Sequence, residues 1–255
     1  MQEGILTGRA DIHIHSMVGD GMAKVPDLLE YVEHCTGLDV IAITDHDDIG
    51  GGYRAREHAG NRRYRFEVIV GAEVTTKEGH LLALFLERPV RSLQSLAKTI
   101  DDIHEQGGIC IVPHPMSWLT RSVGQRALER ILRSASQGLY FDGIETVNAT
   151  IAGKVCAEKV TRLNERRYHL PETGGSDAHF LTLVGTGYTL FEGKTAGDLR
   201  RSLERGTTSS HLDTGRGLGS VGISEIVGQQ FRSLILMPSR RVRRKVRRLL
   251  KGRGG

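Results

Sequence analysis

Six histidines of this chain stand where short runs of β-forming residues end. His13 and His15 lie two apart in one such run, so both side chains project from the same face of a strand. The other histidines and three carboxylates occupy equivalent positions, which gives the set His13, His15, Asp20, His46, Glu73, His80, His114, Asp177 and His179. Imidazole and carboxylate ligands without thiolates suit Mn²⁺, Zn²⁺ or Fe²⁺. The spacing therefore predicts a metal centre built from strand ends.

Nine ligands exceed what one tetrahedral ion needs, so we expect two or three divalent ions that share bridging carboxylates. Glu73 is the best bridge candidate. Two ions roughly 3.5–4 Å apart can activate a water molecule and hold the oxygens of a phosphoryl group. A single strand-end histidine is more often a packing residue, and Asp20 beside Gly21 is equally compatible with a turn. The joint pattern nevertheless favours metal binding.

Other polar residues near these positions are candidates for supporting roles. Asp11, Asp45 and Asp47 are expected to orient ligand imidazoles or to form strand-end turns. Arg121 follows His114, and its planar guanidinium matches phosphate oxygens, although a surface arginine is the alternative. Asn148 is a further candidate for a side chain that faces the pocket. The remaining histidines are expected at the solvated surface: His34, His58, His104, His169 and His211.

The ligands need a fold that brings distant strand ends together. Short β-like runs alternate with helical patterns, which predicts a mainly parallel α/β architecture. Strands are expected at residues 9–15, 40–43, 66–74, 81–86, 109–112, 143–147, 171–174 and 187–191. Helices are expected from Pro26, from a cap at Ser92, over 125–135 and 152–166, and from Thr195 with Asp198 in a capping box. Residues 206–222 are predicted to be a loop.

Composition places the chain among ordinary soluble globular proteins, with 38% hydrophobic and 25% charged residues. Its 255 residues fit one α/β barrel domain. The apolar runs are too short to cross a membrane and no secretion signal is recognisable, so we expect a cytoplasmic protein. The three cysteines are widely spaced, which argues against a disulfide framework or a thiolate zinc site.

The formal net charge of +5 is concentrated at one end of the chain. Residues 239–255 contain nine basic residues and no acidic one, so the rest of the chain carries −4. Four apolar residues fall at helical spacing among the arginines: Val242, Val246, Leu249 and Leu250. Residues 239–251 are therefore either an amphipathic basic helix that binds nucleic acid or an anionic membrane surface, or a disordered cationic tail.

The motifs follow one another as Asp11-Ile12-His13-Ile14-His15, Asp20-Gly21, Ile43-Thr44-Asp45-His46-Asp47, Gly71-Ala72-Glu73-Val74, His80, His114 and Gly175-Ser176-Asp177-Ala178-His179. In this order the sequence resembles the PHP (polymerase and histidinol phosphatase) family of metal-dependent phosphoesterases. The resemblance covers about residues 9 to 192, and its motifs are specific only jointly. The length leaves no room for a polymerase module, so the chain resembles the compact, stand-alone members.

The resemblance implies a distorted, TIM-like seven-stranded (β/α) barrel with up to three divalent ions. It assigns His13, His15, Glu73 and Asp177 to one ion, Glu73, His80 and His114 to a second, and Asp20, His46 and His179 to a third. We expect the barrel to span residues 1–222, with residues 223–255 as an extension that ends in the basic tail.

The activity implied is hydrolysis of a phosphate ester, either a small phosphomonoester or a nucleotide, by a metal-bridging hydroxide. Glu73 and Asp177 would organise the reacting centre, and Arg121 would clamp the phosphate. Two alternatives stay open. One is an exonuclease or oligonucleotide hydrolase that uses the tail, and the other is a non-catalytic binding module stabilised by metal.

Overall fold

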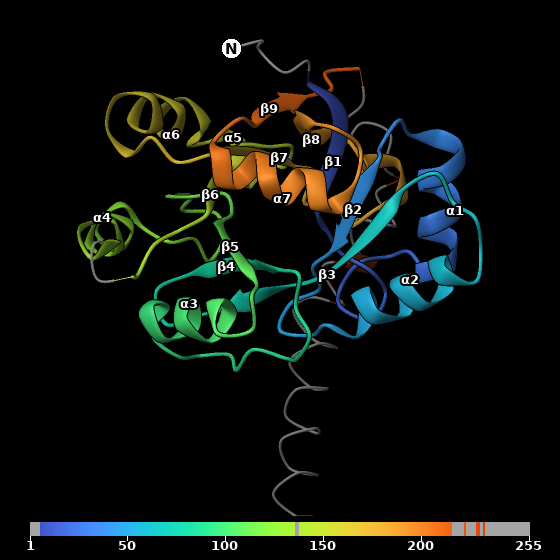
Figure 1. Cartoon of the computed structure of the whole chain (residues 1–255), viewed down its shortest axis with the longest axis horizontal. Coiled ribbons are helices and arrows are strands. Elements are labelled where there is room, and N and C mark those ends of the chain that lie inside the picture. The colour runs from blue at the N-terminus through green and yellow to red at the C-terminus, as the bar shows by residue number, and fades with distance from the viewer. Residues whose placement is uncertain (1–5, 136–137, 216–221, 223–227, 230–231, 233–255) are drawn as a thin grey trace, which may run out of the picture.

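The computed structural model describes residues 6–135, 138–215, 222, 228–229 and 232 (Figure 1). Its strands are β1 (Leu6–Ile14), β2 (Val40–Ile43), β3 (Glu67–Thr75), β4 (His80–Leu84), β5 (Ile109–Val112), β6 (Gly143–Asn148), β7 (Glu172–Gly175), β8 (Gly187–Glu192) and β9 (Ser209–Leu212). Its α-helices are α1 (Val25–Cys35), α2 (Gly50–Gly60), α3 (Leu96–His104), α4 (Gln125–Arg133), α5 (Ile151–Lys154), α6 (Ala157–Leu163) and α7 (Ala196–Arg205).

All the described strands belong to one curled sheet in the order β7-β6-β5-β4-β3-β2-β1-β8-β9. At the end of β1, the His15 amide donates to the Ala178 carbonyl oxygen over 3.0 Å, and the Ala178 amide donates to the His13 carbonyl oxygen over 3.3 Å. These bonds join β1 to the segment that follows β7. The sheet is therefore a nearly closed, distorted barrel surrounded by helices (Figure 1), which confirms the predicted fold class.

The strand directions and number differ from a simple seven-stranded parallel barrel. β1, β2 and β3 are parallel, as are β5, β6 and β7, but β4 is antiparallel to both of its neighbours. A tight turn explains this: the Thr76 amide donates to the Gly79 carbonyl oxygen over 2.9 Å, and so short a connection can join only antiparallel strands. β8 and β9 extend the sheet beyond β1 with antiparallel pairing.

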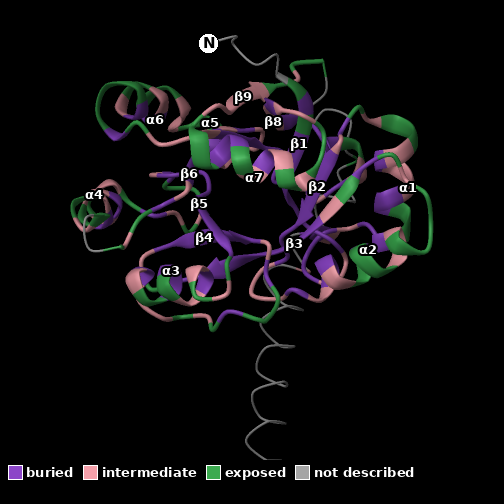
Figure 2. Ribbon diagram, in the orientation of Figure 1, coloured by how far each residue is buried: buried purple, intermediate pink, exposed green. Residues whose placement is uncertain are grey.

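Helix α7 closes one end of the barrel. Leu199 and Leu203 are buried in a cluster with residues of β1 to β5 and Phe191 of β8. The helix is also anchored to residues at or before the starts of strands, because the Ala196 amide donates to Glu67 and Arg200 donates to the Gly107 carbonyl oxygen. Figure 2 shows the buried residues concentrated on the strands and on the inward faces of the helices. Apolar side chains of α7 therefore cover the end of the barrel at which β3 and β5 begin.

Helix α2 was not predicted, because it begins with three glycines that have low helix propensity. The glycines allow close packing instead. A Cβ atom on Gly51 would lie 2.0 Å from Asp45 Oδ2, and one on Gly52 would lie 3.0 Å from Val70 Cα. The side chain of Asp48 accepts the Gly50 amide over 2.8 Å and thereby starts the helix.

Other predicted boundaries also need correction. Helix α3 is capped by Ser95 and not by Ser92, since the Ser95 side chain accepts the Lys98 amide. The single helix expected over residues 152–166 is interrupted between α5 and α6. β9 lies within the predicted loop 206–222, and its polar sequence is typical of an edge strand. The predicted Thr195–Asp198 capping box is present.

Within the described ranges, no helix combines the length and the apolar character that a membrane span requires. Residues 239–251, which carry the predicted basic helix, lie outside the described residues. That helix and the division of the chain near residue 222 stay predictions.

Candidate metal centre

The nine candidate ligands meet at the open end of the barrel. Parallel strands bring their carboxyl ends to one edge, which accounts for the ligands that end or follow β1, β2, β5 and β7. Because β4 runs in the opposite direction, its first residue, His80, reaches the same edge. Seven of the nine side chains are buried, and His46 and His179 are half-buried. The structure thus brings together every ligand candidate identified in the sequence.

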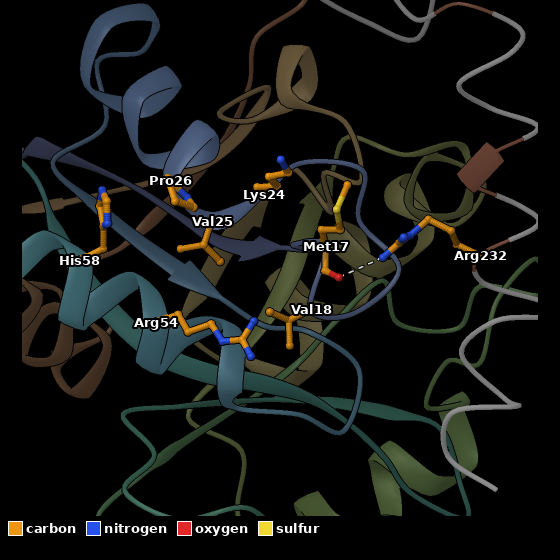
Figure 3. Close-up of a pocket in the computed structure, with 8 residues that line it drawn as sticks. All are labelled: Met17, Val18, Lys24, Val25, Pro26, Arg54, His58 and Arg232. Atoms are coloured by element: carbon orange, nitrogen blue, oxygen red, sulfur yellow. Dashed lines mark hydrogen bonds between the residues drawn. The ribbon is translucent and has the colours of Figure 1, made fainter. Parts of the chain in front are cut away.

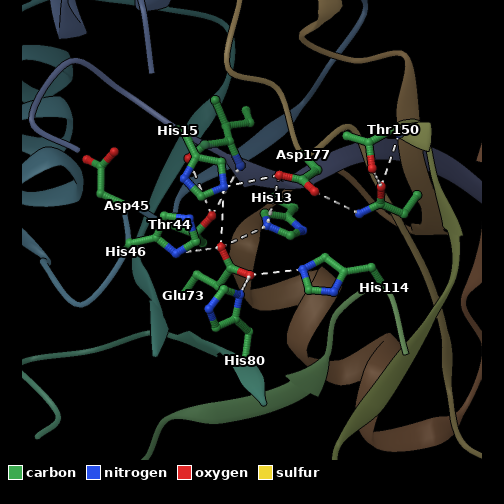
Figure 4. A network of polar contacts seen from close by, with 12 residues as sticks. His13, His15, Thr44, Asp45, His46, Glu73, His80, His114, Thr150 and Asp177 are labelled. Atoms are coloured by element: carbon green, nitrogen blue, oxygen red, sulfur yellow. Dashed lines mark hydrogen bonds and ion pairs between the residues drawn. The ribbon is translucent and has the colours of Figure 1, made fainter. Parts of the chain in front are cut away.

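Glu73, on β3, lies at the centre of the cluster, and its two carboxylate oxygens face different imidazoles (Figure 4). Oε1 lies 2.7 Å from His80 Nδ1 and 3.0 Å from His114 Nε2. Oε2 faces three rings, at 3.0 Å from His46 Nδ1, 3.5 Å from His15 Nε2 and 3.6 Å from His13 Nε2. A carboxylate in this position can hold two cations, one through each oxygen.

Two further carboxylates extend the cluster away from Glu73. Asp177 Oδ1 lies 3.2 Å from His15 Nε2 and 3.5 Å from His13 Nε2. Asp20 Oδ2 lies 3.3 Å from His179 Nε2 and 3.9 Å from His46 Nε2. Negative charge is therefore distributed over three points among the imidazoles, which suits several cations better than one.

The ligand atoms form four overlapping groups whose members lie within 4.8 Å of one another: His13–His15–Asp177, His13–Glu73–His114, His46–Glu73–His80 and His15–Asp20–His46–His179. His15 thus joins the group expected for Asp20, His46 and His179. Several of these atoms are buried without a hydrogen-bond partner, among them His13 Nε2, Asp20 Oδ1 and both ring nitrogens of His15. An unpaired buried polar atom costs about 1–3 kcal/mol. The donor set fits divalent cations, which would satisfy atoms that the protein alone leaves unpaired.

Comparison with known proteins agrees with this geometry. Residues 163–208 match the family model described as PHP-associated. An uncharacterized protein of Methanocaldococcus jannaschii is 35% identical over 151 residues, which cover 55% of this chain and 82% of that protein. The same fold occurs in the crystal structure of a two-domain protein from Bacteroides vulgatus that contains a predicted PHP-like metal-dependent phosphoesterase. That match has a TM-score of 0.60 and 18% identity, and it covers 83% of this chain and 68% of the other.

The chain belongs to the PHP family of metal-dependent phosphoesterases. A 5'-3' exoribonuclease of Haemophilus influenzae is a more distant relative, 28% identical over 108 residues, which cover 41% of this chain and 38% of that protein. We call the cluster formed by the nine candidate ligands, which gathers around Glu73, the PHP centre.

Two carboxylates of the PHP centre, Glu73 and Asp177, carry the negative charge that cations need. Burial would raise the pKa of Glu73, but the imidazoles of His80 and His46 lower it well below its ordinary value. Burial also opposes ionisation of Asp177, yet His13 and His15 lower its pKa to well below the ordinary value of an aspartate. Both carboxylates are therefore ionised over the physiological pH range and available as ligands.

Glu145, on β6, supports two of the ligands and was not identified in the sequence. Its Oε1 lies 2.9 Å from His13 Nδ1, and its Oε2 accepts the backbone amide of His114 over 2.8 Å. Asn148 donates to Glu145 Oε2 over 3.0 Å and lies 3.4 Å from Asp177 Oδ2, so it does face the centre. Glu145 therefore fixes the orientation of the His13 ring and leaves Nε2 free to bind a cation.

The three aspartates expected to orient imidazoles or to form strand-end turns hold backbone amides and hydroxyl groups. Asp11 accepts the backbone amides of His13, Ser176 and Gly185. Asp45 accepts both the amide and the hydroxyl of Ser16, at 2.7 and 2.6 Å, and Asp47 binds the amide and hydroxyl of Thr75. Burial raises the pKa of Asp11 to about 6 and that of Asp45 to about 7. These carboxyls position the ligand-bearing segments by holding the chain on either side of them.

The loop between β5 and α4 is tied to two ligands. The His80 amide donates to the Arg121 carbonyl oxygen over 2.9 Å, and Ser122 Oγ lies 2.9 Å from His114 Nδ1. The exposed side chain of Arg121 donates to the Thr76 carbonyl oxygen over 3.2 Å. Trp118 lies at the tip of this loop and is 76% exposed. The contacts of Arg121 and Ser122 therefore hold the end of the loop against His80 and His114.

A pocket of about 440 Å³ adjoins the segment that joins His15 to Asp20 (Figure 3). Its lining combines an apolar floor with basic side chains: Met17, Val18, Lys24, Val25, Pro26, Arg54, His58 and Arg232. Arg232 donates to the carbonyl oxygens of Met17 and Gly19 at 2.9 and 3.0 Å. No carboxylate lines the pocket among the described residues. This basic pocket is suited to an anionic group.

We expect the metal-loaded protein to contain two or three divalent ions per chain, and loading to release protons. Burial lowers the pKa of His179, but its hydrogen bond to Asp20 and the charges of Asp20 and Asp177 raise the pKa to about 9. The metal-free protein therefore carries a proton on His179 at pH 7.5, and that proton must leave before the nitrogen binds a metal. Metal affinity should accordingly fall as the pH falls. Elemental analysis and calorimetry in buffers of different ionisation enthalpy measure both effects, and fewer than one ion per chain would contradict the assignment.

Proposed function

We propose that this protein hydrolyses a small phosphomonoester or a nucleotide at the PHP centre. The observation that carries the proposal is Glu73, whose two oxygens face separate groups of imidazoles in a buried cluster with unpaired ligand atoms. Metal ions held there would act as Lewis acids. They would lower the pKa of a bound water and stabilise negative charge on the phosphoryl oxygens. Glu73 and Asp177 would hold the ions, and Glu145 would keep the His13 ring in the orientation that binds them.

The surroundings of the centre provide groups for the rest of the substrate. Arg121, at the base of the β5–α4 loop, is our candidate for binding a phosphate oxygen, since its planar guanidinium matches that geometry. Lys24 and Arg54 line the basic pocket without an ion pair among the described residues, so they are available for a second anionic group. Trp118 offers an aromatic face to a base.

The test is a hydrolysis screen on the Mn²⁺-loaded protein with nucleotides, sugar phosphates and 5'-phosphorylated oligonucleotides. We expect turnover of a monoester, and we expect Asp177→Asn to abolish it while the protein stays folded. Absence of turnover on every phosphoester, from a protein that contains its metal ions, would favour the non-catalytic binding module.

If the substrate is a nucleoside phosphate, we expect its base to stack on the indole of Trp118. Stacking of a base on an aromatic side chain contributes about 1–3 kcal/mol, so Trp118→Ala should raise KM for a nucleoside phosphate by roughly 5–150-fold. Trp118→Phe should retain most of the affinity, and KM for glycerol phosphate should not change. Because Trp118 is the only tryptophan of the chain, its fluorescence reports binding directly. Equal KM effects on both substrates would contradict stacking.

A nuclease is the second candidate, favoured by the exoribonuclease relative and by the basic pocket. Deletion of residues 239–255 separates the two functions. A small-ester hydrolase should keep nearly all its turnover, because the proposed ligands are untouched. A nuclease that grips the phosphate backbone through the tail should lose activity on oligonucleotides, and the salt dependence of its binding should become shallower.

A further inference from the structure

His104, Cys110 and Asp142 converge at the amino-terminal end of β5, away from the PHP centre. His104 ends α3, Cys110 lies in β5, and Asp142 immediately precedes β6. One ligand atom from each residue lies within 4.8 Å of the other two. We propose that these three side chains form a separate zinc-binding site, with one thiolate, one imidazole and one carboxylate ligand.

The separation of the sulfur and nitrogen ligand atoms matches tetrahedral zinc. Zn–S bonds of about 2.3 Å and Zn–N bonds of about 2.05 Å place S and N roughly 3.5 Å apart in a tetrahedron. Cys110 Sγ lies 3.5 Å from His104 Nε2. His104 Nε2 lies 2.8 Å from Asp142 Oδ2, a hydrogen bond that must lengthen by about half an ångström to reach the tetrahedral N–O separation. The site therefore needs only a small adjustment to accept the ion.

Hydrogen bonds also connect these atoms without an ion, and Cys110 Sγ donates to the Tyr140 carbonyl oxygen over 3.4 Å. His104 Nε2 faces both Asp142 Oδ2 and Cys110 Sγ, but one ring nitrogen carries at most one hydrogen. Asp142 Oδ2 already accepts the Cys110 amide over 2.8 Å. The ring of His104 is fixed by stacking on Tyr140, with centroids 4.6 Å apart. An ion at the common point would use all three ligand atoms at once.

The charge and exposure of the three residues fit zinc better than a hard cation. Cys110 is fully buried, and burial raises the pKa of its thiol well above the ordinary value. On binding, zinc forms the Zn–S bond as the thiol proton leaves to the buffer, because the ion stabilises the thiolate. The His104 and Asp142 side chains keep 19% and 17% exposure, which leaves a path for the ion and a water as fourth ligand. His104 is thus half-buried and not at the solvated surface as predicted.

This site and the PHP centre are chemically distinguishable. Cys110 lies near the start of β5, whereas His114 follows the end of that strand. The PHP ligand groups contain imidazoles and carboxylates, whereas the second site contains a sulfur ligand. A signal that requires sulfur therefore reports this site alone, whatever the PHP centre does.

The experiment is cobalt substitution of the full chain, because thiolate-bound Co²⁺ gives a sulfur-to-metal charge-transfer absorption in the near ultraviolet. We expect this band in the wild type and its loss in Cys110→Ser. The matched controls Cys35→Ser and Cys156→Ser should keep it, since neither residue belongs to the cluster. His104→Gln, on the helix end, should weaken cobalt binding at least ten-fold and retain the fold by circular dichroism.

Zinc X-ray absorption provides a second readout, with one sulfur scatterer at about 2.3 Å expected in the wild type. A cobalt-loaded wild type without the charge-transfer band, or a band that survives in Cys110→Ser, would overturn the proposal. So would unchanged cobalt affinity in His104→Gln. Hydrolysis at the PHP centre is expected to persist in Cys110→Ser, so failure here would leave the proposed function standing.

Discussion

Replacing Glu73 with glutamine is expected to lower kcat roughly a thousand-fold on any phosphoester that the wild type hydrolyses. The substitution keeps the shape of the side chain but removes the negative charge that both groups of imidazoles face. Loss of that charge weakens cation binding on both sides, and each ~1.4 kcal/mol of lost transition-state stabilisation costs a factor of ten. Steady-state kinetics and metal content, measured on the same preparation, check the expectation.

Two further variants show whether the effect is specific. Glu87→Gln is the matched control, because Glu87 is exposed and its ion pair with Arg56 lies at the surface; its kcat should equal that of the wild type. Glu145→Gln should have an intermediate effect of about 10–100-fold, since Glu145 acts by orienting His13. Wild-type turnover and metal content in Glu73→Gln would remove Glu73 from the centre.

A large loss of stability is expected from Gly51→Ala. A Cβ atom at this position would lie 2.0 Å from Asp45 Oδ2 and 2.9 Å from Ser16 Oγ, inside the contact by which Asp45 holds the segment that leads to Asp20. Overpacking of this kind costs about 2–3 kcal/mol, which corresponds to a fall in Tm of roughly 5–10 °C for a domain of this size. Thermal unfolding followed by circular dichroism measures it.

Gly60→Ala is the control in the same helix, because a Cβ atom there meets nothing within 4 Å. Because alanine has a higher helix propensity than glycine, the substitution should leave the Tm unchanged or raise it slightly. If Gly51→Ala unfolded at the wild-type temperature, the packing of α2 against Asp45 would differ from that described.

The ligands were recognisable in the sequence because their chemistry is repeated at strand ends, where a short apolar run gives way to His, Asp or Glu. His13 and His15 show this most plainly, because they lie two positions apart at the end of β1 and their imidazoles project from the same face. Packing alone does not require two imidazoles there. The barrel was expected from the alternation of strand and helix patterns, from the chain length and from the resemblance to the PHP family. The strand directions of the barrel were not expected, because only the turn at Thr76 and Gly79 decides that β4 is antiparallel.

What the sequence concealed depends on contacts between distant residues. Glu145 looks like any acidic residue within a strand, and only its approach to His13 over 132 positions gives it a role. Helix α2 was hidden by glycines that local propensity disfavours and close packing requires. The hydrogen bonds from the Ser16 amide and hydroxyl to Asp45 likewise join residues that are 29 positions apart.

In the loop between β5 and α4, the residues that hold the candidate ligands in place differ from the exposed residues that a substrate could contact. The carboxy-terminal end of the loop contacts His80 through the Arg121 carbonyl oxygen and His114 through Ser122 Oγ. The Met116 amide donates to the Val123 carbonyl oxygen over 3.0 Å. Trp118 and Leu119, between these fastenings, are exposed and contribute little to the fold. Exchanging the residues at the tip should therefore redirect substrate preference without loosening the ions. In evolutionary terms, a lineage that kept the base of this loop could explore new substrates one substitution at a time.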